Sequence, residues 1–341
     1  MMDLHVWGKS SISVIDPESR AAAWLLCLHL TPQNVNFRIV PSSNTNLADS
    51  NQLPLLVVDN SGKNSKYEGY AEIARYICDT YPSETKFIPD GKLNSFELMV
   101  NLTFTTYLSR TLHYVNQYNL YVNSQNYELY TRKLFLNYLP FPMMYNQPLK
   151  FHENACEQVQ VVGLGVNKTL LFSFTAEKQV AETELIHDDS GSEDEDGVVI
   201  SALHEKSILS KEKSKALLRE TKNSLRCLNL VHQYMTHAIG VFKELHPESP
   251  VEFAHFFRPK KISSCELLLY SYFYSLVSVA LPDRFIAHYL EKKFPTFWSF
   301  ATTITEALNL TLDKSKFRAA KGSEIPSLWN EVNYVLGLQT I

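Results

Sequence analysis

Glycine and cysteine are both scarce in this chain. Eleven glycines in 341 residues exclude a collagen-like repeat, and the ordinary apolar content argues against a fully disordered chain. The cysteines are odd in number and far apart in the sequence: Cys27, Cys78, Cys156, Cys227 and Cys265. This spacing predicts no disulfide framework, favours a reducing compartment and excludes the usual zinc-knuckle pattern.

Long apolar runs are also absent. One of the long uncharged stretches, residues 267–282, covers about sixteen residues and contains several serines and tyrosines. A membrane-spanning helix needs about 20 apolar residues, so we expect a buried core helix there. The first ten residues, MMDLHVWGKS, contain Asp3 and no cationic region before an apolar stretch, so neither a secretory signal nor a matrix presequence is expected.

Acidic charge is concentrated in one segment. The net charge is −4, and residues 187–197, HDDSGSEDEDG, hold six of the 36 acidic residues. The rest of the chain then carries 30 acidic residues against 32 Lys and Arg, which predicts no nucleic-acid partner. Ser190 and Ser192 each precede a glutamate by three residues, so both are candidate phosphorylation sites. An unmodified solvating loop explains the segment equally well.

The first 85 residues alternate between strand and helix patterns. Strands are expected at 4–7, 35–40, 53–58 and near 66–67, and helices at 17–30 and 70–80. Asp16-Pro17-Glu18 starts the first helix, because proline suits the first helical position and an acid suits the first turn. The order β-α-β, then a proline-led hairpin, then α, resembles the thioredoxin-like domain of glutathione transferases. This resemblance implies a cis peptide bond before Pro54.

The same resemblance makes a divergent glutathione transferase the main enzymatic alternative. Those enzymes place a Tyr, Ser or Cys beside the first strand–helix turn, and an acid–Ser pair before the helix that follows the fourth strand. The turn here offers only Ser10, Ser11 and Ser13, and the pair reads Glu68-Gly69, so the hydroxyl is missing. Serines in polar turns are usually turn formers. We therefore predict no catalytic residue, no cofactor-binding residue and no cofactor.

Other chemical motifs fail on spacing. Gly163-Leu-Gly165 is followed by Lys168 without the gap that a phosphate-binding loop requires. His232 and His237 are five residues apart and do not share a helix face well, and no G-x-S-x-G nucleophile elbow occurs. We predict no metal site.

From residue 93 onward, apolar residues recur near every 3.6 positions, which predicts helices. The helical segments lie near 93–122, 124–139, 208–243, 263–281, 283–293 and 295–310. The expected fold is α+β and glutathione-transferase-like: a thioredoxin-like domain at 1–85, then an all-helical domain at 86–172 and 208–312. An acidic disordered insertion at 173–207 interrupts the helical domain, and a tail follows at 313–341.

The tail has an apolar stripe of its own. Its members are Ile325, Leu328, Trp329, Val332, Val335 and Leu336. We expect a terminal helix that docks on the body or on a partner. The stripe and the aromatic faces between Tyr118 and Tyr138 are candidate partner surfaces, with internal packing as the alternative.

Residues 117–148 are the most informative stretch. They combine two aromatic-rich amphipathic segments with a proline stop and include Asn126-Tyr127, Tyr130-Thr131-Arg132 and Leu139-Pro140-Phe141-Pro142. These residues resemble the signature of metaxins, especially the fungal metaxin-like peripheral subunit of the mitochondrial sorting and assembly machinery. Residues 263–304 also resemble the closing helices of that family.

The metaxin resemblance implies a non-enzymatic role in assembling β-barrel proteins at the cytosolic face of the mitochondrial outer membrane. The implied partners are the membrane-embedded β-barrel assembly subunit, a second glutathione-transferase-like peripheral subunit and the general outer-membrane translocase. Membrane association would then depend on protein partners. Two alternatives stay open: a divergent glutathione transferase, and a glutathione-transferase-like scaffold in a cytosolic complex.

Overall fold

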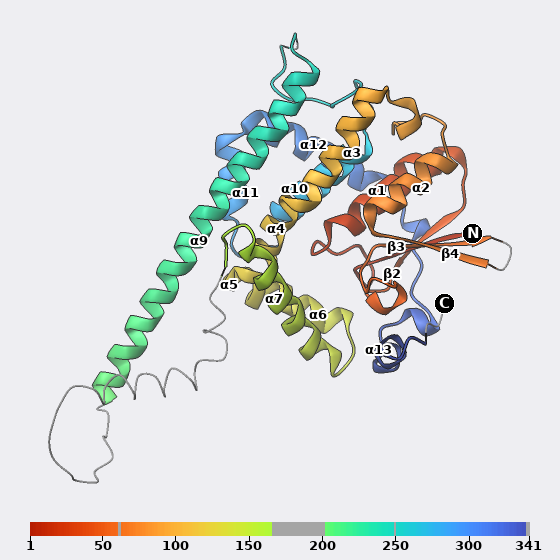
Figure 1. The fold of residues 1–341 in the computed structure, drawn as a ribbon. Helices are drawn as coiled ribbons and strands as arrows, with labels where there is room; N and C mark the ends of the chain where they lie inside the picture. Colours follow the sequence, from red (N-terminus) through yellow and green to blue (C-terminus); the bar gives the residue numbers. More distant parts are fainter. Residues whose placement is uncertain (61–62, 166–201, 249, 339–341) are drawn as a thin grey trace, which may run out of the picture.

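A computed structural model describes residues 1–60, 63–165, 202–248 and 250–338 (Figure 1). Ser190 and Ser192, and most of the predicted insertion at 173–207, lie outside these residues. The body consists of a small sheet with its helices on one side of the molecule and a larger helical part on the other.

The N-terminal unit contains a four-stranded mixed sheet. Its strands are β1 (Met2–Val6), β2 (Phe37–Pro41), β3 (Leu55–Asn60) and β4 (Lys63–Glu68), and its helices are α1 (Pro17–Leu30) and α2 (Gly69–Thr80). The strand order is β2-β1-β3-β4. β1 runs parallel to β2 and antiparallel to β3, so Leu4 lies opposite both Ile39 and Leu56. This topology is thioredoxin-like and confirms the predicted N-terminal architecture.

Helix α1 begins and ends at the predicted residues. Pro17 occupies the first helical position and Glu18 lies in the first turn. Every residue of this helix except Glu18 is buried, Trp24 completely, and α1 packs against the central helix α10 (Ser264–Leu276). Helix α1 therefore links the sheet to the helical domain.

The helical domain follows from residue 95. Its helices are α3 (Ser95–Arg110), α4 (Leu112–Gln117), α5 (Ser124–Asn126), α6 (Arg132–Tyr138), α7 (Met143–Gln160), α9 (Ala202–Leu245), α10, α11 (Phe285–Lys293) and α12 (Pro295–Thr311). Together with the sheet, these helices confirm the predicted glutathione-transferase-like α+β fold. The expected core helix within 267–282 is α10, which is buried along its length. None of the helices in the described parts of the chain is both long enough and apolar enough to cross a bilayer.

Three features of the helical domain differ from the expectation. Residues Tyr118–Val122 (η4) and Tyr127–Thr131 (η5) form π-helical turns within the aromatic stretch. Helix α7 was not among the predicted segments, because it begins directly after Pro142 and contains Pro148, which reads as a helix stop. Helix α9 begins at Ala202, before the predicted residue 208, and its N-terminal half projects from the body (Figure 1).

The tail returns to the sheet and ends in α13 (Leu328–Val335). Phe317 forms a parallel bridge to Ile39 at the edge strand β2, and the Arg318 N–H donates to the Ile39 carbonyl at 2.9 Å. The Arg318 guanidinium donates to Asp3 at 2.8 Å and to both carboxylate oxygens of Glu324 at 2.7 Å. These contacts cover the open edge of β2, which protects it from pairing with another chain.

Candidate functional site

The turn after β1 holds Ser10, Ser11 and Ser13, which are the candidate residues for the enzymatic alternative. Gly8 has a φ of +148°, and a Cβ there would lie 1.9 Å from the Ser11 carbonyl oxygen, so only glycine fits. Ser10 and Ser11 are exposed. Ser13 is buried, and its hydroxyl oxygen accepts hydrogen bonds from the Tyr138 hydroxyl at 3.0 Å and the Ile15 N–H at 3.3 Å. The Tyr138 bond joins the turn to α6, and the Ile15 bond lies within the turn.

The acid before α2 is also engaged within the chain. Glu68 accepts hydrogen bonds from the backbone N–H groups of Asp49 at 2.6 Å and Ser50 at 2.9 Å. The Leu53–Pro54 peptide bond is cis, and the Pro54 carbonyl accepts from the Gly69 N–H at 2.9 Å. Glu68 therefore fixes the loop that leads into Pro54.

A side chain from α1 occupies the start of α2. The Glu18 carboxylate accepts a hydrogen bond from the Tyr70 N–H at 3.2 Å. A helix N-terminus attracts anions because its first N–H groups have no partner within the helix. Here Glu18 supplies that anion from within the chain.

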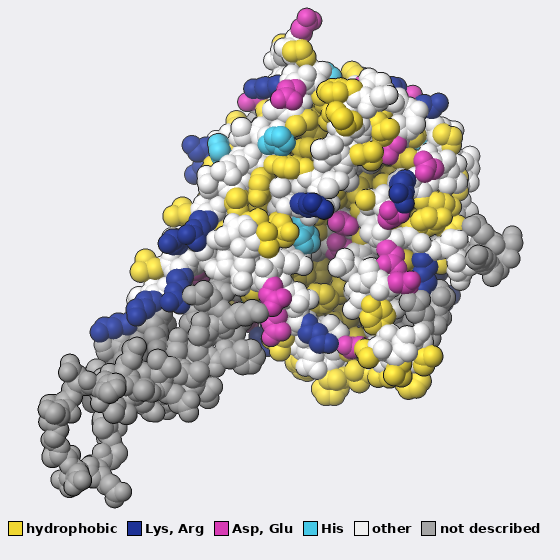
Figure 2. Space-filling model, viewed as in Figure 1, with side chains coloured by type: hydrophobic (Ala, Val, Ile, Leu, Met, Phe, Trp, Pro, Cys, Tyr) yellow, Lys and Arg dark blue, Asp and Glu magenta, His cyan; other side chains and the backbone are white. Residues whose placement is uncertain are grey.

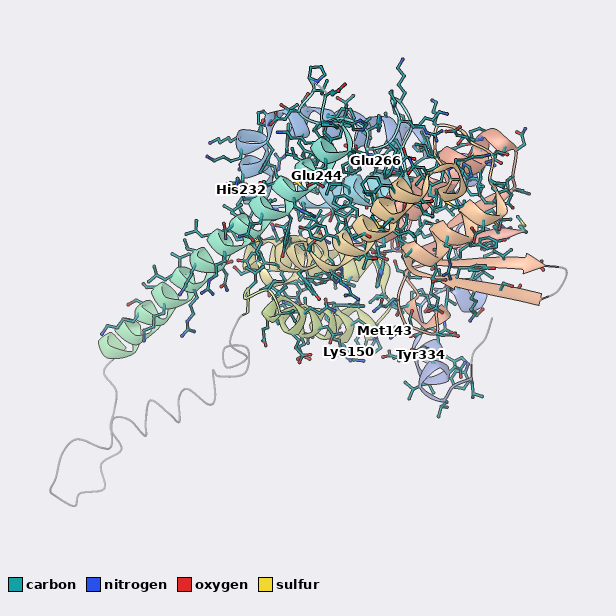
Figure 3. The ribbon with its side chains drawn as sticks, turned by 45° about the horizontal axis from the view of Figure 1, so that its top comes forward. Met143, Lys150, His232, Glu244, Glu266 and Tyr334 are labelled. Atoms are coloured by element: carbon teal, nitrogen blue, oxygen red, sulfur yellow. The ribbon has the colours of Figure 1, made fainter. Side chains whose placement is uncertain are left out.

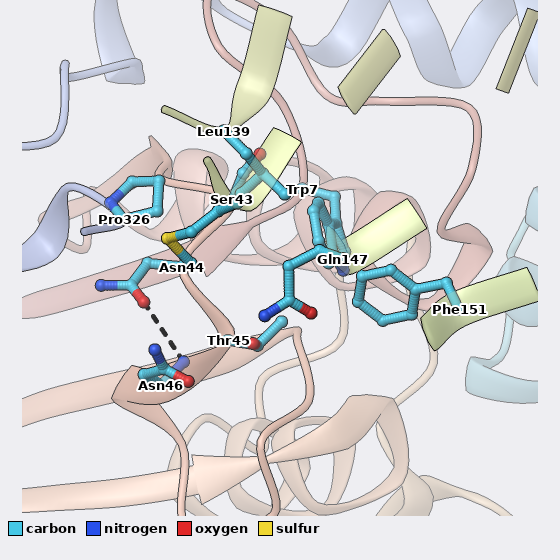
Figure 4. Close-up of a pocket in the computed structure, with 10 residues that line it drawn as sticks. Trp7, Ser43, Asn44, Thr45, Asn46, Leu139, Gln147, Phe151 and Pro326 are labelled. Atoms are coloured by element: carbon cyan, nitrogen blue, oxygen red, sulfur yellow. Dashed lines mark hydrogen bonds between the residues drawn. The ribbon is translucent and has the colours of Figure 1, made fainter. Parts of the chain in front are cut away.

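Aromatic side chains fill the space between the sheet and the helical domain. Trp7, at the end of β1, makes edge contacts with Phe135 of α6 at 5.8 Å and Phe151 of α7 at 5.6 Å between ring centroids. Leu53 and Met143 belong to the same buried cluster. Figure 4 shows Gln147 and Phe151 beside Trp7 in the remaining pocket.

The remaining cavity beside Trp7 measures about 10 Å³. This volume approximates the space for one water molecule, whereas pockets for drug-sized ligands span about 300–1,000 Å³. A tripeptide such as glutathione does not fit there. The space beside the first strand–helix turn is therefore a packed core in this chain.

Two charged side chains near this core, Asp16 and Arg20, make contacts with other residues of the chain. Burial raises the pKa of Asp16 to about 7, with a further contribution from the charge of Glu18, and Asp16 accepts a hydrogen bond from the Ser19 hydroxyl. Arg20 donates to the Ile12 carbonyl at 2.9 Å and packs over the Tyr274 ring at 4.2 Å. Both residues join α1 to its surroundings.

All five cysteines are buried free thiols. Burial raises the pKa of Cys27 to about 12 and that of Cys156 to about 11. Burial also raises the pKa values of Cys78, Cys227 and Cys265. The thiols therefore stay protonated near neutral pH and are poor nucleophiles. In the described residues, no group of His, Cys, Asp and Glu side chains is arranged to hold a metal ion.

The tail helix α13 has an apolar face and a polar face, and the sequence alone did not show which of them faces the body. Helix α13 docks through its polar face: Asn330 and Asn333 are buried, and Asn330 donates to the carbonyls of Ser323 and Ile325 at 2.8 Å. The predicted apolar stripe points outward, with Trp329 70% and Val335 77% exposed. The tail therefore ends in a helix that docks on the body, as predicted. It packs through its polar face, and its apolar stripe is exposed.

Polar contacts join α13 to α7 and to the loop before Pro54. Glu331 accepts hydrogen bonds from Gln147 at 3.1 Å and Lys150 at 3.2 Å. The Tyr334 hydroxyl donates to the Asp49 carbonyl at 2.9 Å. Figure 3 shows Lys150 and Tyr334 on the same side of the molecule, where α7 approaches α13.

Two family models match this sequence. The model of Tom37, described as an outer mitochondrial membrane transport complex protein, matches residues 19–152. The model of the Tom37 C-terminal domain matches residues 180–338. The first match includes the whole 117–148 stretch, and the second includes 263–304 and α13.

One curated relative and two solved structures are also similar. A Metaxin-1 homolog of Drosophila melanogaster is 28% identical over 170 residues, which cover 49% of this chain and 48% of the relative. The aligned chain thus spans about half the length of this relative.

Among solved structures, FzlA from C. crescentus has a TM-score of 0.43 at 11% identity, covering 97% of each chain. A glutathione S-transferase of Ceriporiopsis subvermispora, solved in complex with glutathione, has a TM-score of 0.48 at 11% identity, covering 90% of this chain and 97% of the transferase. The fold assignment depends on the strand order and the helices described above. The two Tom37 models together match most of the sequence, so the chain belongs to the Tom37, or metaxin, family of outer mitochondrial membrane transport complex proteins.

Proposed function

We infer that this chain is a non-enzymatic subunit of the machinery that inserts β-barrel proteins into the mitochondrial outer membrane. The match to both Tom37 models is the observation that carries this function. In this role the chain stabilises the complex from the cytosolic face and aids the release of folded barrels into the lipid.

The proposed partners are proteins of the same membrane. They are the membrane-embedded β-barrel assembly subunit, a second glutathione-transferase-like peripheral subunit and the general outer-membrane translocase. Such a role needs complementary surfaces and no reactive centre. The exposed stripe on α13 and the projecting half of α9 offer surface that the body does not cover.

The filled interdomain space supports the non-enzymatic part of the proposal. Trp7 and Phe151 occupy the region beside the first strand–helix turn, and Ser13 is bonded to Tyr138. Glu18 supplies the anion at the start of α2. A transferase needs an open pocket in this region and a hydroxyl or thiol that faces it.

Affinity purification tests the proposed function. The full-length chain carries a tag, mitochondria are solubilised with a gentle detergent, and co-purifying proteins are quantified by mass spectrometry. We expect the β-barrel assembly subunit and a second peripheral subunit to be enriched over a control in which the tagged chain is added after lysis. An intact cytosolic chain without either protein would contradict the proposal.

Two further measurements separate the alternatives. Binding to immobilised glutathione with turnover of an electrophile would favour a transferase, and we expect neither. Co-sedimentation with ribosomes or synthetase complexes would favour a cytosolic scaffold.

A further inference from the structure

The outward-facing stripe of α13 adjoins a second exposed apolar region. The tail surface consists of Ile325, Leu328, Trp329, Val332, Val335, Leu336 and Leu338, which are 47–77% exposed. The turn surface consists of Leu136, Phe141, Tyr145 and Leu149 from α6, α7 and their connection, which are 49–75% exposed. We call the two together the apolar edge.

Several contacts place these two surfaces next to each other. Glu331 of α13 bonds to Gln147 and Lys150 of α7. Pro326, just before α13, lines the same small cavity as Leu139 and Met143. In Figure 2, hydrophobic side chains gather along the lower edge of the molecule, where Figure 1 places the α6–α7 turn and α13.

The orientation of α13 is the unusual feature. A helix on a globular protein normally buries its apolar stripe and exposes its polar face. Helix α13 buries Asn330 and Asn333 and exposes Trp329 and Val335. Soluble proteins rarely display continuous apolar surfaces of this size unless the surface binds something.

The charges around the apolar edge favour a lipid surface as its occupant. The edge itself contains no ionised side chain. Of the acidic groups near it, Glu331 pairs with Lys150 and Glu324 pairs with Arg318, while the exposed Glu153 lies four residues after Leu149 on α7. Exposed lysines flank it, with Lys133 one turn before Leu136 and Lys321 four residues before Ile325.

The residue types at the apolar edge suit the membrane interface as well. Tryptophan and tyrosine concentrate at the level of lipid headgroups, because their rings combine an apolar body with a polar group. Lysines close to an anionic leaflet are attracted to its negative surface charge.

We propose that the apolar edge inserts into the headgroup region of an anionic lipid bilayer, with Trp329, Val335 and Phe141 as the inserting side chains. The contact is interfacial, since α13 has eight residues and lies along the body. It adds a direct lipid contact to the protein partners proposed above, and it fixes which side of the body faces the membrane. One weak interfacial contact binds reversibly, so stable attachment needs a second signal, which those partners provide.

Vesicle flotation with the purified full-length chain tests the inference. The vesicles contain phosphatidylcholine alone or phosphatidylcholine mixed with phosphatidylglycerol. We expect the chain to float with the mixed vesicles and to bind pure phosphatidylcholine more weakly. Replacing Trp329→Gln and Val335→Asn together should reduce binding to the mixed vesicles by about 10-fold or more, because two apolar side chains no longer leave water.

A matched control removes the same number of exposed apolar side chains elsewhere. Val279 is 83% and Leu310 is 88% exposed, and neither belongs to the apolar edge. The Val279→Asn and Leu310→Asn double variant should float like the wild type. A wild-type chain that binds neither vesicle, or a control variant that loses binding to the same extent as the edge variant, would overturn the inference.

Tryptophan fluorescence gives a second readout. Trp7 and Trp24 are buried and Trp298 is partly buried, so vesicle binding should shift mainly the emission of Trp329 to shorter wavelength. The Trp329→Phe variant keeps an aromatic ring and should still float, while the emission shift disappears. A shift that persists in this variant would show that another part of the chain meets the lipid.

The vesicle and purification experiments have separate outcomes. The inference uses the proposed function only to identify the membrane. Vesicle binding can fail while the barrel-assembly proteins still co-purify, which removes the lipid contact alone. If co-purification depends on Trp329 and vesicle binding is absent, the edge is a protein interface and the lipid inference is wrong.

Discussion

The Glu18 carboxylate lies 3.2 Å from the backbone nitrogen of Tyr70 and links the first turn of α1 to the first turn of α2. One side chain thereby places negative charge at the starts of two helices, where their dipoles favour it. The Glu18 carboxylate therefore occupies the anion-attracting start of α2 from within the chain.

Removing the Glu18 carboxylate should destabilise the fold modestly. Glu18→Ala leaves the Tyr70 N–H without its partner, and we expect a loss of about 1 kcal/mol in the free energy of unfolding. Urea denaturation measures it. Glu72→Ala is the control, because Glu72 is exposed in the first turn of α2 and pairs only with Arg75, so its loss should stay below about 0.5 kcal/mol.

The Ser13–Tyr138 hydrogen bond should contribute to stability and to no catalytic step. Ser13→Ala and Tyr138→Phe should each cost about 1 kcal/mol, and the double variant should cost less than the sum, because each change removes the same bond. Ser10→Ala, at an exposed site, should have little effect. A glutathione-dependent rate in the wild type that collapses in Ser13→Ala would make the chain an enzyme.

The aromatic packing between the domains should be the largest contribution to test. Trp7→Ala removes the ring that contacts Phe135 and Phe151, and we expect a loss of about 3–5 kcal/mol because the surroundings cannot close the cavity. Trp7→Phe should lose less. If Trp7→Ala melts like the wild type in a thermal scan, the cluster is not a packed core.

Asp16 should make stability fall as pH rises. Burial raises its pKa in the folded chain to about 7, above the ordinary value of an aspartate. Its contribution is therefore complete below the unfolded pKa, near 4, and is lost as pH rises through 7. Asp16→Asn should remove this dependence and gain about 1–2 kcal/mol relative to the wild type at pH 8. Denaturation across pH 5–8 measures both; parallel curves for the two proteins would contradict the assignment.

Arg318 should hold the tail on the sheet. Burial alone would raise the pKa values of Asp3 and Glu324, but hydrogen bonds from Arg318 help to lower both below their usual values. This contribution is present above the unfolded pKa of these acids and is lost as pH falls through their folded values. Arg318→Met should cost about 1–3 kcal/mol at pH 7 and speed protease cleavage within 313–338. Arg219→Met, on the exposed part of α9, is the control.

The sequence predicted the architecture well because the patterns that define it are local. Pro17 and Glu18 mark the start of α1, and the continuous apolar run at 53–58 marks β3. The uncharged run at 267–282 identified α10 as a core helix. Helix α7 was missed, since Pro148 and the prolines before Met143 are local signals for a loop, and packing of Phe151 and Met143 against Trp7 outweighs them.

Within the candidate site, the sequence showed which residue types are present, but it did not show which residues contact one another. The loss of the hydroxyl at Gly69 was readable from the sequence. The engagement of Glu68 with the loop at Asp49 and Ser50 was not, because these contacts join segments separated in the sequence. No sequence pattern predicted the hydrogen bond from the Tyr70 N–H to Glu18.

The tail shows most clearly where local information ends. The spacing of Trp329, Val332 and Leu336 determined that α13 would have an apolar stripe. Only the tertiary structure decided its direction, because the carbonyls of Ser323 and Ile325 satisfy Asn330, and the neighbouring α7 offers Lys150 and Gln147 to Glu331. The spacing of apolar residues in the sequence shows which of them share one face of the helix. Which face is buried depends on the neighbouring groups, and only the folded chain brings these groups together.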